Sequence, residues 1–164
     1  MCLAQIVFYS HNRVAMTGGS MRDMVRDILA SCSRYDHTTG ITGTLIFNEA
    51  YFLQAMEGDR AAISEQLWRL AEDDRQSGMV LLFAGAIDRR DFEGWTVGFA
   101  GHTPALDALY LLHGTQAKLD PPPMTARGAV GLLRAVSHLD GTHYVQKSTP
   151  LAGAAREPAR RPTA

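Results

Sequence analysis

The sequence predicts an α+β fold, a ferredoxin-like β-α-β-β-α-β sandwich with an extra edge strand and two C-terminal helices. Two observations support this prediction. Apolar runs of strand length alternate with longer segments in which apolar residues recur at helical spacing. In addition, six of the seven prolines lie beyond residue 120, so the composition changes between the first hundred residues and the remainder.

The first strand and helix are predicted near the amino terminus. The run from Leu3 to Ser10 is short and mostly apolar, which is typical of a buried strand. Ser20 is a suitable N-cap for the helix that follows, because its hydroxyl can accept a backbone N–H. The apolar stripe of this helix consists of Met24, Val25, Ile28, Leu29 and Cys32.

The middle of the chain predicts a hairpin, a helix and two more strands. Only three residues separate the apolar runs Ile41 to Phe47 and Tyr51 to Met56, so a hairpin is expected. Asp59 is positioned to cap a second helix, which Gly78 follows. The runs Met79 to Ile87 and Trp95 to Ala100 are predicted to be strands, the latter at the edge of the sheet.

The carboxyl-terminal third reads as helical and then unstructured. Thr103 and Pro104 fit the cap and first position of a helix that ends at Gly114, and a second amphipathic helix ends at Gly141. Beyond it, the chain is polar and rich in Pro, Ala and Arg, which favours disorder. The predicted divisions are therefore a globular domain at 1–101, a helical cap at 102–140 and a disordered tail at 141–164.

Size and charge narrow the functional classes. A chain of 164 residues and 17.9 kDa, with 46% hydrophobic and 20% charged residues, fits one compact domain. Its formal charge of −1 provides no basic field for nucleic acid or an anionic membrane, so neither partner is expected. The longest apolar stretches are far shorter than the roughly 20 residues of a membrane span, and no secretory signal is expected.

Residues of catalytic or metal-binding type are scattered. Cys2 and Cys32 form no CxxC pair, which favours a reducing cytoplasm. The six histidines lack ligand spacing, so no metal is predicted. We find no phosphate-binding glycine loop, no Ser/His/Asp order and no HExxH motif, and the sequence therefore predicts no enzyme. An RNA-recognition module shares the topology, but the near-neutral charge argues against it.

Two polar residues are expected to meet inside the sheet. Right-handed crossovers are expected to place the first and third strands side by side and parallel, with both helices on one face. Tyr9 ends the first strand, while Gln54 alternates with Phe52 and Met56 on the third, facing the helices. A buried amide needs a partner, and Tyr9 is the candidate. Either the two form a satisfied core pair, or both contact a planar polar ligand.

Several short motifs together resemble one family. They are Phe8-Tyr9-Ser10, Gly40-Ile41-Thr42-Gly43, Phe52-Leu53-Gln54, Met56-Glu57-Gly58 and the run from Arg89 to Trp95. In this order and spacing they resemble the BLUF domain, a blue-light sensor that uses FAD. The resemblance covers Leu3 to about Ala100, and the helical extension is similar to that of short, stand-alone BLUF proteins.

The resemblance implies roles for individual residues. Tyr9 would donate an electron and a proton to the photoexcited flavin, and Gln54 would bridge tyrosine and flavin with an amide that rearranges in the light. A glutamine amide has both donors and an acceptor, so two hydrogen-bond patterns can be close in energy. Trp95 matches a tryptophan of the family's last strand, although an anchoring role over the sheet explains it equally well. The residues implied to contact FAD are Tyr9, Ile28, Leu29, Asp36, His37, Phe52, Gln54, Arg69 and Arg75.

Some of these residues have a simpler structural explanation. Arg69 and Arg75 match basic positions at or beside the phosphate end of the cofactor, but solvated helix charge would also account for them. Ile28 and Leu29 would pack on the ring, as the apolar stripe of their helix already predicts.

Asp36 departs from the family pattern. Four residues before Gly40, the family has an asparagine that bonds the pyrimidine edge of the flavin, whereas an ionised aspartate only accepts hydrogen bonds. Asp36 could be protonated, His37 could supply the missing donor, or flavin affinity could have fallen. An Asx-turn is the purely structural explanation.

The sequence as a whole predicts a stand-alone BLUF photoreceptor. With no catalytic segment recognised, its output would pass to a separate downstream protein or through self-association as a homo-oligomer. The alternative is a BLUF-like interaction module with weak or no flavin binding.

Overall fold

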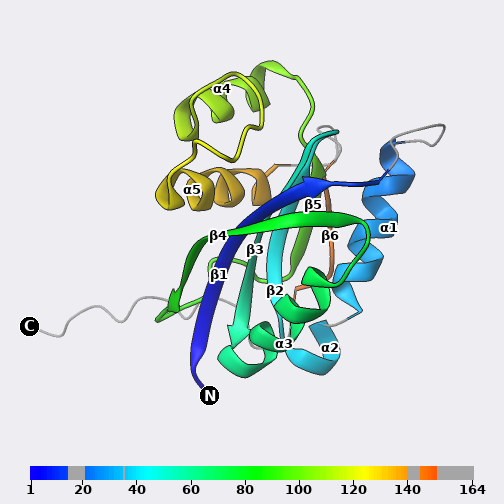
Figure 1. Cartoon of the computed structure of the whole chain (residues 1–164), viewed down its shortest axis with the longest axis vertical. Helices are drawn as coiled ribbons and strands as arrows, with labels where there is room; N and C mark the ends of the chain where they lie inside the picture. The colour runs from blue at the N-terminus through cyan, green and yellow to red at the C-terminus, as the bar shows by residue number, and fades with distance from the viewer. Residues whose placement is uncertain (15–20, 35, 140–144, 151–164) are drawn as a thin grey trace, which may run out of the picture.

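The fold is a twisted sheet with helices on both faces (Figure 1). This computed structural model describes residues 1–14, 21–34, 36–139 and 145–150. The strands are β1 (Leu3–Asn12), β2 (Thr42–Phe47), β3 (Tyr51–Asp59), β4 (Gln76–Ala86), β5 (Trp95–Phe99) and β6 (Val145–Lys147). The helices are α1 (Met21–Ser33), α2 (Asp36–Thr39), α3 (Arg60–Ala71), α4 (Pro104–His113) and α5 (Ala126–Ser137).

The element order confirms the predicted β-α-β-β-α-β core, with a further strand and two helices after it. The predicted caps Asp59 and Thr103 each accept a backbone N–H of the first turn, from Ala61 and Leu106 respectively. The cap predicted at Ser20 lies outside the described residues. The four-residue helix α2 was not predicted.

The strand order is β4-β1-β3-β2-β5-β6. Strands β1 and β3 are neighbours, as predicted, but they run antiparallel, so the expectation of parallel strands is wrong. Each crossover helix connects strands separated by a third strand, and the strand that fills the gap runs in the opposite direction. Strand β5 pairs parallel to β2, and β6 covers its other side. The strand at 95–99 is consequently not the edge that was predicted.

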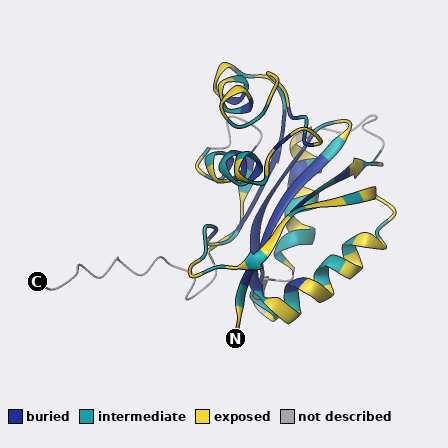
Figure 2. Cartoon of the chain, turned by 60° about the vertical axis from the view of Figure 1, so that its left-hand side comes forward, coloured by how far each residue is buried: buried dark blue, intermediate teal, exposed yellow. Residues whose placement is uncertain are grey.

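Two apolar layers sandwich the sheet. Helices α1 and α3 pack on one face, around Ile6, Phe8 and Met56. Helix α5 packs on the opposite face, around Val7 and Leu53, and α4 packs against α5. Figure 2 shows the central strands buried between these layers. Both faces of β1 and β3 are therefore interior surfaces.

The carboxyl-terminal part differs from the prediction at one point. The predicted disordered tail began at 141, yet Val145–Lys147 forms strand β6 against β5. Three residues are too short to show a periodicity, while the pairing satisfies the backbone edge that β5 would otherwise expose. Residues 140–144 and 151–164 lie outside the described residues, as does the predicted helix end at Gly141. Within the described ranges, no helix is both long and apolar enough to cross a membrane.

Candidate functional site

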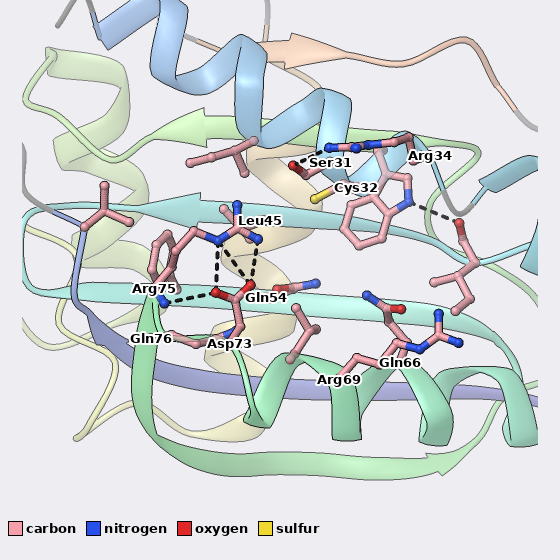
Figure 3. A pocket seen from close by; sticks show the side chains of 16 residues that line it. Ser31, Cys32, Arg34, Leu45, Gln54, Gln66, Arg69, Asp73, Arg75 and Gln76 are labelled. Atoms are coloured by element: carbon pink, nitrogen blue, oxygen red, sulfur yellow. Dashed lines mark hydrogen bonds and ion pairs between the residues drawn. The ribbon is translucent and has the colours of Figure 1, made fainter.

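A cavity of about 250 Å³ opens between α1, α3 and the face of the sheet that they cover (Figure 3). Its lining residues are Val14, Ile28, Ser31, Cys32, Arg34, Ile41, Leu45, Phe52, Gln54, Gln66, Arg69, Leu70, Asp73, Arg75, Gln76 and Trp95. The walls combine apolar side chains with the amides of three glutamines and the guanidinium groups of three arginines. Such a combination suits a flat, largely apolar molecule that has polar edges and a charged extension.

Gln54 is the most informative polar residue of the cavity. Its side chain projects from β3 into the cavity and is only 3% exposed. The amide makes no hydrogen bond to any described residue. Because the amide faces the cavity, its donors and its acceptor are open to a ligand.

Tyr9 does not meet Gln54. In the β1–β3 register, Gln54 lies across from Phe8, and Tyr9 lies across from Leu53. Because side chains alternate along a strand, Phe8 lies on the same face as Gln54, and Tyr9 lies on the opposite face. There, the ring of Tyr9 packs edge-on against that of Tyr51, with the ring centres 6.1 Å apart. The expected Tyr9–Gln54 pair is therefore wrong, and neither form of it is present.

The apolar walls come from three elements. Ile28 of α1, Phe52 of β3 and Trp95 of β5 all line the cavity. Trp95 is 3% exposed, and its indole Nε1 donates a 3.1 Å hydrogen bond to the carbonyl oxygen of Ile41. Leu29, by contrast, packs between two core clusters and is not among the lining residues.

Three arginines line the cavity, namely Arg34, Arg69 and Arg75 (Figure 3). Arg69 bonds Glu65 one helical turn away, and Arg75 makes a bidentate contact with Asp73. The Arg75 guanidinium lowers the pKa of the Asp73 carboxyl below its usual value. Arg34 donates to the hydroxyl of Ser31 at 3.2 Å. These cations are positioned to attract an anionic group.

Five polar lining residues escaped the sequence analysis, namely Ser31, Arg34, Gln66, Asp73 and Gln76. Gln66 lies four residues before Leu70, on the same side of α3, and this spacing was available as a signal. Gln76 accepts a 2.6 Å hydrogen bond from the Ser10 hydroxyl across the β1–β4 pair. Nothing local in the sequence indicates that contact. Asp36 and His37 belong to α2, but their side chains lie outside what the structure describes.

The segment Gly40–Gly43 forms one end of the site. Gly40 has a φ of 66°, a conformation that glycine adopts without strain. At Gly43, a Cβ atom would lie 2.1 Å from the carbonyl oxygen of Ala55, so only glycine fits beside β3. Arg90 fixes this segment by donating to the Gly40 carbonyl at 2.7 Å and to the Thr42 hydroxyl at 2.8 Å.

Glu57 is buried outside the cavity, on the face toward α5. Its carboxylate accepts hydrogen bonds from the Gln5 amide and from the backbone N–H groups of Asp91 and Phe92. Burial is the largest influence and raises its pKa, although the hydrogen bonds oppose the shift. Asp91 in turn pairs with Arg134 of α5. No cluster of His, Cys, Asp or Glu suited to a metal ion occurs within the described part of the chain.

Comparisons with known proteins agree with this fold. The family model described as BLUF, sensors of blue light using FAD, matches residues 3–98. The photo-activated state of BlsA superposes with a TM-score of 0.69 at 17% identity, covering 84% of this chain and 96% of that one. BlrB, a BLUF protein in its dark state, gives a TM-score of 0.52 at 24% identity, covering 60% and 71%.

A bacterial light-regulated adenylyl cyclase has a TM-score of 0.57 at 16% identity, covering 67% of this chain and 32% of that one. At these identities, the structures show a shared fold and no more. No curated protein matches the chain.

The residues of the cavity fit FAD. A planar ring suits the apolar lining residues, among them Ile28 and Phe52. The Gln54 amide, which bonds no described residue, suits a polar ring edge, and the arginines suit a diphosphate. The family senses blue light with FAD, and FAD is accordingly the cofactor of this domain. From the family match over most of the sheet and the fold shared with BlsA and BlrB, it follows that this chain belongs to the BLUF family of blue-light sensors.

Proposed function

We propose that this chain binds FAD in the cavity between α1 and α3 and that blue light rearranges the hydrogen bonds of Gln54. The single observation that supports this proposal is Gln54, a residue only 3% exposed whose amide faces the cavity and bonds no described residue. FAD supplies the absorption of blue light, since none of the twenty side chains absorbs there.

The side chains of the cavity have separate tasks in this proposal. Ile28 and Phe52 hold the ring between apolar surfaces and exclude water from it. Gln54 presents two donors and one acceptor to the ring edge, so a rotation of its amide exchanges one hydrogen-bond pattern for another. A two-state amide of this kind is the local event that a switch requires. Tyr9 has no part in the proposal, because it lies on the other face of β1.

For the output, we propose contact with a second copy of the chain along β4. This strand is an edge of the sheet among the described strands, and Gln76–Ala86 contains neither a charged residue nor proline. Val80, Leu81 and Phe83 are exposed on it. Native proteins usually protect such an edge, and antiparallel pairing of two identical strands would cover this one symmetrically.

The purified protein tests the cofactor directly. We expect a yellow preparation with a flavin spectrum, which blue light shifts slightly to the red and darkness restores. Gln54→Leu removes the amide while keeping the volume, and it should abolish the shift and lower FAD affinity. Leu53→Ile, on the opposite face of the same strand, serves as the matched control. A preparation that stays colourless after incubation with excess FAD would overturn the proposal.

The alternative is an interaction module with weak or no flavin binding, and Asp36 is the residue that favours it. An ionised carboxylate beside a flavin carbonyl would repel it, whereas asparagine would donate a hydrogen bond. Measuring the FAD affinities of the parent protein and of Asp36→Asn distinguishes the photoreceptor from the interaction module. Equal, tight binding supports the photoreceptor, and a colourless parent that becomes yellow upon substitution supports the alternative.

A further inference from the structure

Phe8 occupies the position from which a β1 side chain faces Gln54. The two residues are directly paired across β1 and β3, and Phe8 is fully buried on the α1 and α3 side of the sheet. A phenyl ring has neither a hydroxyl to bond Gln54 nor a phenolic proton to release. The cavity side of β1 therefore offers no phenol beside Gln54.

Trp95 is the electron-rich aromatic residue of the cavity. Of the described lining residues, only Phe52 and Trp95 are aromatic, and indole is much more easily oxidised than a phenyl ring. The ring of Trp95 is buried, and the hydrogen bond to the Ile41 carbonyl fixes its orientation. Tyr9 is separated from the cavity by the sheet itself.

We propose that Trp95, and not Tyr9, gives an electron to the light-excited FAD of this chain, an inference that rests on the proposed function. One electron leaves the indole and enters the excited ring of the cofactor. The same electron then returns to the indole. Neither partner is changed after the cycle, and no external oxidant or reductant is consumed.

The proton of Trp95 stays in place during this exchange. Its indole N–H points to the Ile41 carbonyl oxygen, which accepts a hydrogen bond but is too weak a base to remove the proton. A phenol beside Gln54 would lose both an electron and a proton. The pair formed with Trp95 should consequently recombine faster than one formed with a phenol, and the time available for Gln54 to rearrange should be shorter.

Emission of the bound FAD tests the donor, because electron transfer competes with fluorescence. Trp95→Phe should raise the emission yield several-fold. Trp68→Phe is the matched control, since Trp68 is 72% exposed on α3 and is not a lining residue. This control and Tyr9→Phe should leave the yield unchanged. An increase with Tyr9→Phe and none with Trp95→Phe would overturn the inference.

Phe8→Tyr provides a test that does not depend on the stability of Trp95→Phe. A hydroxyl introduced opposite Gln54 should quench the emission further and enlarge the light-induced red shift several-fold. An unchanged emission and shift in Phe8→Tyr with bound FAD would contradict the inference. Loss of FAD binding by the parent protein would instead contradict the proposed function, which the visible spectrum reports separately.

Discussion

The side-chain amide of Gln5 donates a 2.7 Å hydrogen bond to the carboxylate of Glu57, deep between β1 and β3. The two residues are paired across the strands and both face α5. Backbone N–H groups of the β4–β5 connection donate to the same carboxylate. A titratable group is therefore enclosed in the layer between the sheet and the C-terminal helices.

The stability of the protein should depend on pH through Glu57. Burial raises the pKa of this carboxyl above 4.5, so the folded state keeps a proton that the unfolded state releases. The free energy of unfolding should fall as the pH rises from 4.5 through the folded-state pKa. Each unit of pKa shift corresponds to about 1.4 kcal/mol. Denaturant unfolding at a series of pH values measures this slope.

Glu57→Gln provides the comparison, because an amide does not titrate. The variant should lack this slope, whatever its absolute stability. Asp59 and Asp73 have lowered pKa values, so they affect the free energy of unfolding in the opposite sense and at lower pH. Their contribution to stability is lost only as the pH falls below 3.8. Parallel curves for parent and variant between pH 4.5 and 7 would refute the role of Glu57.

Gly43→Ala should destabilise the fold by about 3 kcal/mol or more, because the new methyl group would overlap the Ala55 carbonyl oxygen. Gly58→Ala is the matched control on β3. There, the nearest atoms would lie 3.4 Å from the new Cβ, and a change within about 1 kcal/mol is expected. Thermal unfolding of both variants checks the difference. Equal melting temperatures would show that β2 can move away from β3 at little cost.

Arg134→Ala should weaken the attachment of α5 to the β4–β5 connection. The Arg134–Asp91 pair is partly exposed, so the expected loss is about 0.2–1 kcal/mol, and it should shrink in high salt. Arg127→Ala removes an exposed arginine of the same helix that has no ion pair with a described residue. Denaturant midpoints at low and high salt measure both effects. A loss independent of salt would point to packing by the arginine stem instead.

Leu81→Lys should disrupt the proposed self-association along β4. Leu81 is 52% exposed on the edge strand, and a charge there would be buried between two copies. Leu112→Lys, on exposed α4, is the control. Sedimentation at several protein concentrations should show a dimer for the parent and for the control, and a monomer for Leu81→Lys. A parent protein that is monomeric throughout would exclude this interface.

The order of the elements was predictable because loops, caps and periodicity mark it locally. Asp59 and Thr103 signal helix starts by their chemistry alone, and the three residues between β2 and β3 leave room only for a hairpin. The direction of β3 relative to β1 is not local information. It depends on the strand order, in which β3 lies between β1 and β2, the two strands that α1 connects.

The sequence also could not predict which residues of β1 face the cavity side of the sheet and which face the opposite side. Ile6 and Phe8 on one face are matched by Val7 and Tyr9 on the other, so both alternations are equally apolar. A shift of one residue exchanges the two faces, and a strand buried on both sides gives no polar stripe that would fix the choice. Only the pairing with Gln54 decides it.

Because β1 is buried on both faces, its alternate side chains belong to two separate apolar layers. Phe8 lies on the side of the sheet that α1 and α3 cover, the same side as the cavity, and Tyr9, the next residue, faces the layer of C-terminal helices. Substitutions at neighbouring positions can therefore alter colour and attachment of the terminal helices independently. Two properties of the protein, its cofactor site and the packing of its C-terminal helices, therefore depend on neighbouring positions of one strand.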